Sequence, residues 1–436
     1  MHIKRLSSFL AVLALALLPT LTTACGGSSD NAKGGAASTT STPPATRGNV
    51  GGTLTFGQLA PQTGSIASIS PSLTTPVRIA VDEINAAGGV NGQPVALAVA
   101  DDGGGENPPV AKASLDTLLT TSKVDAIVGP TASGTALDLL GTIRQDGVLT
   151  CSGSTSAEEL SVADSGGYFF RTAPPDRLQA LALARLVVAQ GKHKPVIIAR
   201  DDGYGDAFAL PLARELRNLD AAPVGSVIRY KPTARNLAGI GTRAASRHPD
   251  SIITISLPDD GARIVQSLNA AGVGPAQVPL YTADGMQSTT LHTKVDPANP
   301  ASVVGIVGTA PAAAPAGPDN AFTDALRKAG VAPIFSAYYH DCTILTALAA
   351  VQAKSDDPAK MKAAFAKSLS GTTDCSTFAA CTQALAAGKT IHYRGASSAF
   401  DHWDGTEPGD GTYDVWSYGG AGNVVTGTPS QQIRVP

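Results

Sequence analysis

Residues 75–92 read TPVRIAVDEINAAGGVNG, a pattern that predicts a helix ending in a glycine turn. Thr75 can cap this helix, Pro76 suits its first position, and Gly88 can end it. Its apolar face consists of Val77, Ala80, Val81 and Ile84. Apolar runs at 54–59 and 95–100 flank the helix, so this part of the chain predicts a β-α-β unit.

The same alternation continues along the chain. Further short apolar runs stand at 125–129, 147–151, 194–199, 251–256 and 278–282. A second helix is indicated after Asn107 and Pro108, with an apolar stripe of Ala111, Leu115, Leu118 and Leu119. The strands lack polar alternation, as expected when helices cover both faces of a parallel sheet. The sequence therefore predicts an α/β fold with doubly wound sheets.

Length and composition narrow the class further. A chain of 436 residues suggests two or three domains, and 43% hydrophobic residues can build a core. Only 15% of residues are charged and the net charge is −3. Without a basic excess, a nucleic-acid groove is not expected.

The N-terminus has the features of a secretion signal. Lys4 and Arg5 precede the apolar run FLAVLALALL at 9–18, which is too short to span a membrane. The following LTTACG at 21–26 resembles the lipobox of bacterial lipoproteins. This implies a signal peptide at 1–24, lipidation of Cys25, a flexible tether at 25–52 and extracytoplasmic anchoring to the cell membrane. The alternative is an ordinary secretory peptide with an incidental cysteine.

Two hydroxyl-rich loops follow the third and fourth predicted strands. The first reads GPTASGT at 129–135 and contains Ser133; the second reads SGSTSAEE at 152–159. Hydroxyls and free amides at a helix N-terminus bind anions. Ligands of such sheets also bind beside the carboxyl ends of strands. Two adjacent loops could clamp one carboxylate, or each serine could only cap its helix.

Signatures of catalysis are weak. The sequence contains no HExxH, GxSxG or CxxC motif. His340, Asp341 and His402 could form a triad only through tertiary proximity. Asp284 follows a predicted strand and is either a turn residue or a ligand of a cation. We expect a protein that is not an enzyme and holds neither metal nor cofactor.

The order of these motifs resembles a known family. AVDEINAAGGVNG at 80–92 is similar to the AVxxINxxGGVxG segment of branched-chain amino acid-binding proteins, the type I periplasmic binding proteins of ABC importers. Asp101-Asp102, the two serine loops, Phe170-Arg171-Thr172 and Tyr204-Gly205 follow in the family's order. The resemblance implies two α/β lobes joined by three hinge crossovers. It places the first lobe at 53–171 plus 308–394 and the second at 172–307 plus 395–436.

The resemblance also implies a site between the lobes. The family's binding positions fall on Ser133, Gly134, Ser154, Ser156, Tyr204 and Asp284. Ser133, the Gly134 amide and Ser156 match the carboxylate loops. The Ser154 carbonyl and Asp284 match the partners of the ammonium, and Tyr204 matches the aromatic that covers the ligand.

Two positions depart from the family pattern. Leu257 and Ile69 stand where pocket aromatics are expected. The ligand's side chain is therefore open between aliphatic, aromatic and small amide groups.

Four cysteines remain after Cys25, an even number for an oxidising compartment. Cys375 and Cys381 are close in sequence and are expected to form a local disulfide. Cys151 and Cys342 either pair or remain buried free thiols, and free thiols are the expectation.

The leading interpretation is a monomeric substrate-binding lipoprotein that delivers an amino acid or similar small carboxylate to an ABC importer permease. A ligand-sensing receptor component of the same fold is the alternative, and a secreted α/β hydrolase is a third.

Overall fold

The computed structural model describes residues 52–105, 107–313 and 321–436. The predicted signal peptide, Cys25 and nearly all of the tether therefore lie outside the described residues. None of the helices in these three ranges combines the length and apolar character that a membrane span needs.

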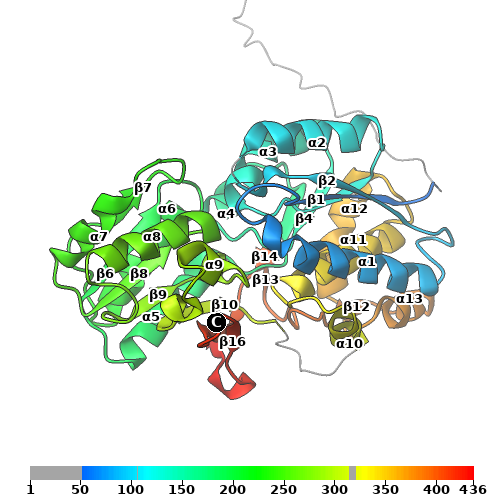
Figure 1. Cartoon of the computed structure of the whole chain (residues 1–436). Coiled ribbons are helices and arrows are strands. Elements are labelled where there is room, and N and C mark those ends of the chain that lie inside the picture. The colour runs from blue at the N-terminus through cyan, green and yellow to red at the C-terminus, as the bar shows by residue number, and fades with distance from the viewer. Residues whose placement is uncertain (1–51, 106, 314–320) are drawn as a thin grey trace, which may run out of the picture. The chain divides into compact units, whose positions relative to one another are not determined.

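The first lobe is built on a five-stranded parallel sheet in the order β2-β1-β3-β4-β5. Its strands are β1 (Thr55–Ala60), β2 (Ala96–Asp101), β3 (Ala126–Val128), β4 (Leu149–Ser152) and β5 (Phe169–Arg171). One face is covered by α2 (Pro108–Thr120) and α3 (Ser133–Asp146), with the short α4 (Glu159–Val162) (Figure 1). The other packs on α1 (Ser70–Ala86), α11 (Ser336–Ala353), α12 (Pro358–Phe365) and α13 (Phe378–Ala386). The lobe also carries α10 (Ala321–Lys328) and the parallel strands β11 (Thr373–Cys375) and β12 (Ile391–Tyr393).

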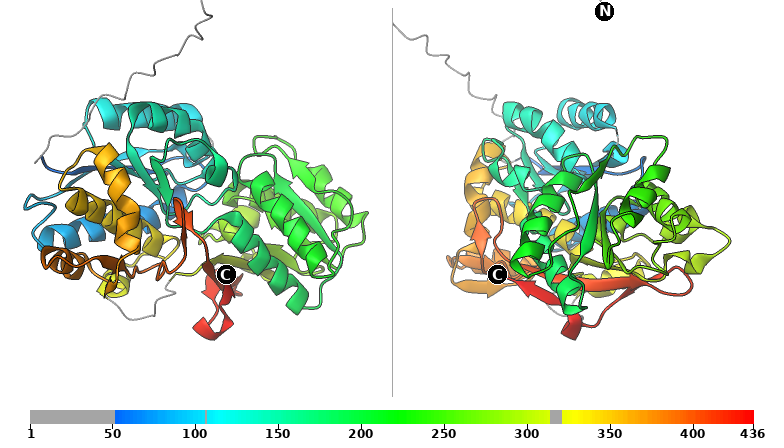
Figure 2. Two further views of the ribbon diagram at one scale, coloured as in Figure 1. Left: turned by 180° about the vertical axis from the view of Figure 1, so that it is seen from behind. Right: turned by 90° about the vertical axis from the view of Figure 1, so that its left-hand side faces the viewer.

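The second lobe has an eight-stranded mixed sheet. Its parallel strands are β6 (Pro195–Arg200), β7 (Ile228–Tyr230), β8 (Ser251–Ile255), β9 (Leu280–Thr282) and β10 (Ile306–Pro311). Antiparallel strands β15 (Gly411–Tyr418), β16 (Val424–Thr426) and β17 (Ile433–Val435) complete it. Helices α5 (Asp176–Ala189) and α6 (Gly205–Asn218) cover one face, as the left view of Figure 2 shows. The other face packs on α7 (Ala238–Ala245), α8 (Pro258–Ala270) and α9 (Leu291–Val295).

The two doubly wound lobes, one with a parallel sheet and one with a mixed sheet whose central strands are parallel, match the expected fold class. All seven predicted strands are present, with ends that differ by at most two residues. The second predicted helix is confirmed as α2, which begins at Pro108 and buries its apolar stripe.

The first helix begins earlier than predicted. α1 starts at Ser70, with Pro71 in its first turn and Pro76 in its interior, so the prediction that Pro76 opens the helix is wrong. A proline at position 76 removes the amide that would bond the carbonyl of Ser72. The Ser336 hydroxyl donates to this carbonyl at 2.7 Å, from 264 residues further along the chain.

The segments that connect the lobes differ in place from the expectation. β10 pairs with β9 and β15 of the second sheet, so the expected change of lobe at residue 308 falls inside a second-lobe strand. The hairpin of β13 (Trp403–Asp404) and β14 (Glu407–Pro408) packs on the first lobe, where the Arg171 amide donates to the Thr406 carbonyl. The last segment therefore enters the second sheet at Gly411 and not at residue 395.

Both cysteine pairs of the described chain are disulfide-bonded. Cys375 is joined to Cys381, the pair expected from their separation. Cys151 is joined to Cys342, which links β4 to α11, so the expectation of free thiols is wrong. The two residues are 191 positions apart, and only the packing of α11 on the sheet brings them together.

Candidate functional site

A cavity of about 440 Å³ opens where loops from both lobes meet. All six residues expected from the resemblance line it: Ser133, Gly134, Ser154 and Ser156 from the first lobe, and Tyr204 and Asp284 from the second. These residues follow the carboxyl ends of strands, the usual place for ligands of parallel sheets.

The two serine loops of the first lobe are joined by hydrogen bonds. The Ser133 hydroxyl, at the start of α3, accepts from the amides of Ser156 at 3.1 Å and Ala157 at 3.2 Å. Its own proton remains available for an acceptor in the cavity. Gly134 lies in the first turn of α3, and a Cβ atom placed there would meet nothing within 4 Å. The loops thus present hydroxyls and first-turn amides to the cavity, which is a suitable arrangement for a carboxylate.

Ser154 has a different position. Its hydroxyl donates to the Thr131 carbonyl at 2.7 Å and lies 3.0 Å from the Tyr339 hydroxyl. The side chain therefore holds the two loops and α11 together, and only its backbone is suited to a ligand.

Tyr204 covers the second-lobe side. It precedes α6, and the Asp202 carboxylate accepts from the amides of Tyr204 at 3.2 Å and Gly205 at 2.9 Å. The turn requires glycine at 205, because a Cβ atom there would lie 2.2 Å from the Arg200 carbonyl oxygen. The Tyr204 hydroxyl donates to Asp284 Oδ1 at 3.4 Å. It also accepts from the Gly285 amide at 3.3 Å.

One buried carboxyl group, Asp284, lines this cavity, and a second, Asp176, lies near Asp284 without lining the cavity. Burial raises the pKa of Asp284 to about 6, although hydrogen bonds from Gln179 and Tyr204 oppose the shift. Burial also raises the pKa of Asp176 well above its usual range, and the charge of Asp284 adds to that shift. Neither oxygen of Asp176 accepts a hydrogen bond of good geometry from the described residues, although the Ser156 hydroxyl is close enough to lower its pKa.

Asp176 is the residue that sequence reasoning missed. It is the first residue of α5, where an aspartate normally indicates helix capping. Here its backbone amide donates to the Ser156 carbonyl at 2.7 Å, while its fully buried carboxylate accepts no hydrogen bond of good geometry from the described residues. An unpaired buried carboxylate is costly, so a cation supplied from outside would stabilise it.

The remaining wall of the cavity is mainly apolar. Ile69 and Leu257, the two departures from the family pattern, both line it. The other apolar side chains there include Ile66, Leu137, Ile334 and Phe335.

Arg200 also lines the cavity, but its charge is already matched. It donates to Asp202 at 2.7 Å and to Asp260 at 2.6 Å. The Tyr230 hydroxyl donates to the second oxygen of Asp260. The cation is therefore held in the second lobe and does not neutralise the Asp176–Asp284 pair.

The histidines considered for a triad lie elsewhere. His340 is buried between Glu83 and Asp341, which raise its pKa to about 9 against the effect of burial. The Ser397 hydroxyl donates to Asp341 and not to the histidine. Neither His340 nor His402 lines the binding cavity. Within the described residues, no three His, Cys, Asp or Glu side chains gather in a metal-binding arrangement.

Comparison with known proteins agrees with this architecture. The sequence profile of the periplasmic binding protein family matches residues 53–391. The Leu/Ile/Val-binding protein BraC3 of Rhizobium johnstonii is 27% identical over 239 residues, which cover 54% of this chain and 62% of that relative. The chain thus spans less than two thirds of that relative's length.

Two further matches extend over most of the chain. The chemotactic signal transduction system substrate-binding protein BasB of Halobacterium salinarum is 27% identical over 369 residues, covering 81% of this chain and 84% of BasB. The crystal structure of a leucine-binding protein, LivK, from Thermotoga maritima MSB8 superposes with a TM-score of 0.70. It shares 17% identity and covers 86% of this chain and 98% of LivK, which shows a common fold. Because the family profile extends over more than half of the chain, the protein belongs to the periplasmic binding protein family.

Proposed function

We propose that this protein is an extracytoplasmic substrate-binding protein that captures an α-amino acid with an apolar side chain. The observation that carries this proposal is the buried carboxyl group of Asp284, which lines the cavity together with a hydroxyl-amide loop and lies close enough to the buried Asp176 to affect its pKa. The ammonium of a zwitterion supplies the cation that the acids lack, and its carboxylate supplies an acceptor for the hydroxyls and amides of the loop.

Each end of the zwitterion has a suitable partner. The ammonium would pair with Asp284, with Asp176 behind it, and donate to the Ser154 carbonyl. The carboxylate would accept from the hydroxyls of Ser133 and Ser156 and from first-turn amides of α3. Buried charges are tolerated when they are paired and hydrogen-bonded, so binding removes the cost of the unpaired acids.

The apolar wall favours the class of side chain. Ile69, Leu137, Leu257 and Phe335 offer contacts to an aliphatic or aromatic group and few hydrogen-bonding groups. Tyr204, from the second lobe, would close over the ligand. A ligand that touches both lobes favours the closed arrangement through its differential affinity.

The calorimetric test uses three related compounds. L-Leucine carries both charged groups, 4-methylpentanoate lacks the ammonium, and 3-methylbutylamine lacks the carboxylate. We expect L-leucine to bind at least about thirtyfold more tightly than either analogue, because 4-methylpentanoate leaves the buried acids without a cation and 3-methylbutylamine leaves the hydroxyl and amide donors without an acceptor. Equal binding of 4-methylpentanoate, or binding of no member of an amino acid panel, would refute the proposed ligand class.

In this proposal the protein is a monomer held at the membrane, and it delivers the bound amino acid to an ABC importer permease. Family membership supports it. Sensing is the second candidate, because BasB, a relative matched over 84% of its length, is named for chemotactic signal transduction. Loss of uptake of the bound amino acid in a deletion strain would support transport, whereas loss of taxis with intact uptake would support sensing.

Lipid anchoring has its own test. Replacing Cys25 by serine removes the thiol that accepts diacylglycerol, so the protein is expected to leave the membrane fraction or stay unprocessed. Two or three acyl chains suffice for stable anchoring, and their loss therefore changes the fractionation completely. An unchanged distribution between membrane and soluble fractions would contradict the lipoprotein proposal.

Affinity is expected to depend on pH through Asp284. Because the pKa of Asp284 is raised from 3.8 to about 6, the ligand-free folded protein holds a proton there, between these two pH values, that the unfolded chain has lost. This adds stability at low pH, and the contribution disappears as pH rises through 6. Ammonium binding has the opposite dependence because it needs the charged carboxylate.

The affinity for L-leucine should therefore fall by about tenfold per pH unit below about pH 6, as expected for release of one proton. Calorimetric titrations from about pH 5 to 8, in buffers of different ionisation enthalpy, measure both the affinity and the released proton. An affinity independent of pH over this range would be inconsistent with an ammonium held by Asp284.

A further inference from the structure

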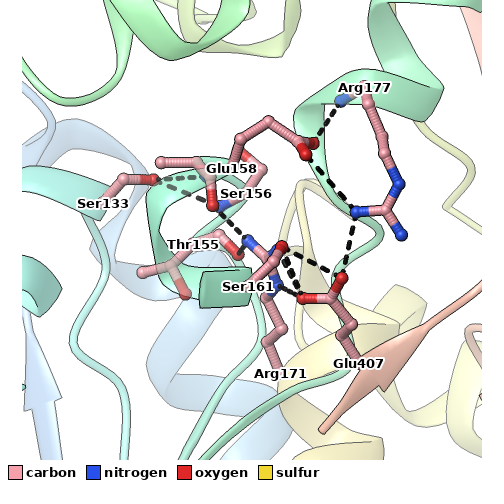
Figure 3. Close-up of polar contacts among 9 residues, drawn as sticks. Ser133, Thr155, Ser156, Glu158, Ser161, Arg171, Arg177 and Glu407 are labelled. Carbon is pink, nitrogen blue, oxygen red and sulfur yellow. Dashed lines mark hydrogen bonds and ion pairs between the residues drawn. The ribbon is translucent and has the colours of Figure 1, made fainter. Parts of the chain in front are cut away.

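An ion-pair network lies directly behind the Ser156 loop. It joins Arg171 at the end of β5, Arg177 in the first turn of α5, and Glu407 in β14 (Figure 3). Arg171 and Arg177 stand on either side of the first connection between the lobes, and Glu407 belongs to the last one. None of these three residues lines the binding cavity.

Arg171 holds the backbone on both sides of Ser156. Its Nη1 donates to the carbonyl of Ala157 at 2.8 Å and, more weakly, to that of Thr155 at 3.4 Å. Its Nε and Nη2 donate to one oxygen of Glu407 at 2.9 and 2.5 Å. The side chain is 2% exposed, so the guanidinium has a single buried arrangement. A planar fork of this kind fixes its acceptors geometrically.

Glu407 connects this fork to the neighbouring elements. Its other oxygen accepts from Arg177 Nη1 at 3.0 Å, and both its oxygens lie 3.0 Å from the Ser161 hydroxyl. The loop is tied to α5 as well, because Glu158 accepts from the Arg177 amide at 2.7 Å. These contacts leave the loop around Ser156 little freedom to rearrange.

We propose that Arg171 and Glu407 are positioning residues, which hold the Ser156 loop in its ligand-binding geometry and tie it to the first and last connections between the lobes. The inference rests on the proposed function for its consequence in affinity, but the ordering of the loop is independent of which ligand binds. A preorganised loop binds more tightly because it loses less conformational entropy on binding.

Two conservative variants test the ordering of the loop. Arg171→Lys keeps the charge but loses the fork, and Glu407→Gln keeps the shape but loses the charge. Hydrogen exchange of the ligand-free proteins, read by mass spectrometry, should be at least about tenfold faster for amides 153–161 in both variants, the size expected when hydrogen bonds to a charged group are lost. Glu83→Gln is the matched control, because Glu83 is a half-buried carboxylate that accepts from the Phe378 amide and contacts His340. It should leave amides 153–161 unchanged.

A double-mutant cycle of Glu407→Gln with Ser156→Ala tests whether Glu407 affects ligand affinity through Ser156. Titration with L-leucine should show at least about tenfold weaker binding by Glu407→Gln and by Ser156→Ala, with a combined loss clearly smaller than their product. A network that only stabilised the fold would give multiplied losses, or none, in the folded protein.

The outcomes separate the two claims. Unchanged exchange of amides 153–161 in both variants overturns the positioning role, whatever binds. If wild type does not bind L-leucine, the proposed ligand fails, and faster exchange confined to the loop still supports positioning.

Discussion

Replacement of Asp284 by asparagine is expected to weaken amino acid binding by about 2–5 kcal/mol, because it removes the charge that the ammonium would meet in a desolvated site. Asparagine keeps the shape and can still accept from the Tyr204 hydroxyl, so the turn after β9 is preserved. Above about pH 6 the ligand-free variant should be as stable as wild type or more stable, since a buried charge has been lost. Calorimetric titration and thermal unfolding measure the two effects.

Asp125→Asn provides a matched control for this prediction. Burial raises the pKa of Asp125 to about 6 as well, and this carboxylate accepts from the Thr55 amide at 2.8 Å. Asp125 precedes β3, so it lies at the N-terminal end of this strand, whereas the ligand loops follow the carboxyl ends of the strands. Its replacement should leave affinity unchanged. If Asp284→Asn lowers stability and spares affinity, Asp284 is a turn residue and not an ammonium partner.

Removal of the Cys151–Cys342 disulfide is expected to have the largest effect on stability. The bond closes a loop of 191 residues between β4 and α11. Without the bond the unfolded chain gains conformational entropy, which lowers the free energy of unfolding. The loop-entropy relation gives a loss of up to about 5 kcal/mol, within the usual range of about 2–5 kcal/mol. Urea unfolding of a Cys151→Ala, Cys342→Ala double variant should show this loss.

The second disulfide serves as the internal comparison. Cys375 and Cys381 are only 6 residues apart, so the same relation gives about 2 kcal/mol for their removal. Peptide mapping without reductant should find the Cys151 peptide linked to the Cys342 peptide. Free thiols at both positions, or equal losses for the two double variants, would contradict the assignment.

Local patterns account for much of what the sequence predicted. Short apolar runs and helix stop signals depend on neighbours within a few residues, so the seven predicted strands and the start of α2 at Pro108 could be read directly. The start of α1 could not, because Thr75-Pro76 has the form of a helix start although Pro76 lies inside the helix. The Ser336 hydroxyl, from a distant segment, satisfies the carbonyl that Pro76 leaves without an amide partner.

The residues of the candidate site were also predictable from the sequence only in part. Ser133, Ser156 and Asp284 follow strands, and order along the chain was enough to place them at one end of the sheets. Asp176 was missed because an aspartate at a helix start ordinarily caps the helix. Its importance depends on what surrounds its carboxylate after folding.

The sequence by itself determined the alternating strands and helices of the doubly wound fold and the loops that line the cavity, since each depends on residues close together in the chain. Lipid attachment at Cys25 stays a prediction. Tertiary structure alone decided that Cys151 pairs with Cys342, that the Asp176 carboxylate is buried without a hydrogen bond of good geometry, and how Arg171 meets Glu407 across 236 residues. Burial and pairing of this kind depend on side chains from distant segments packing against one another, and no local pattern of residues encodes that contact.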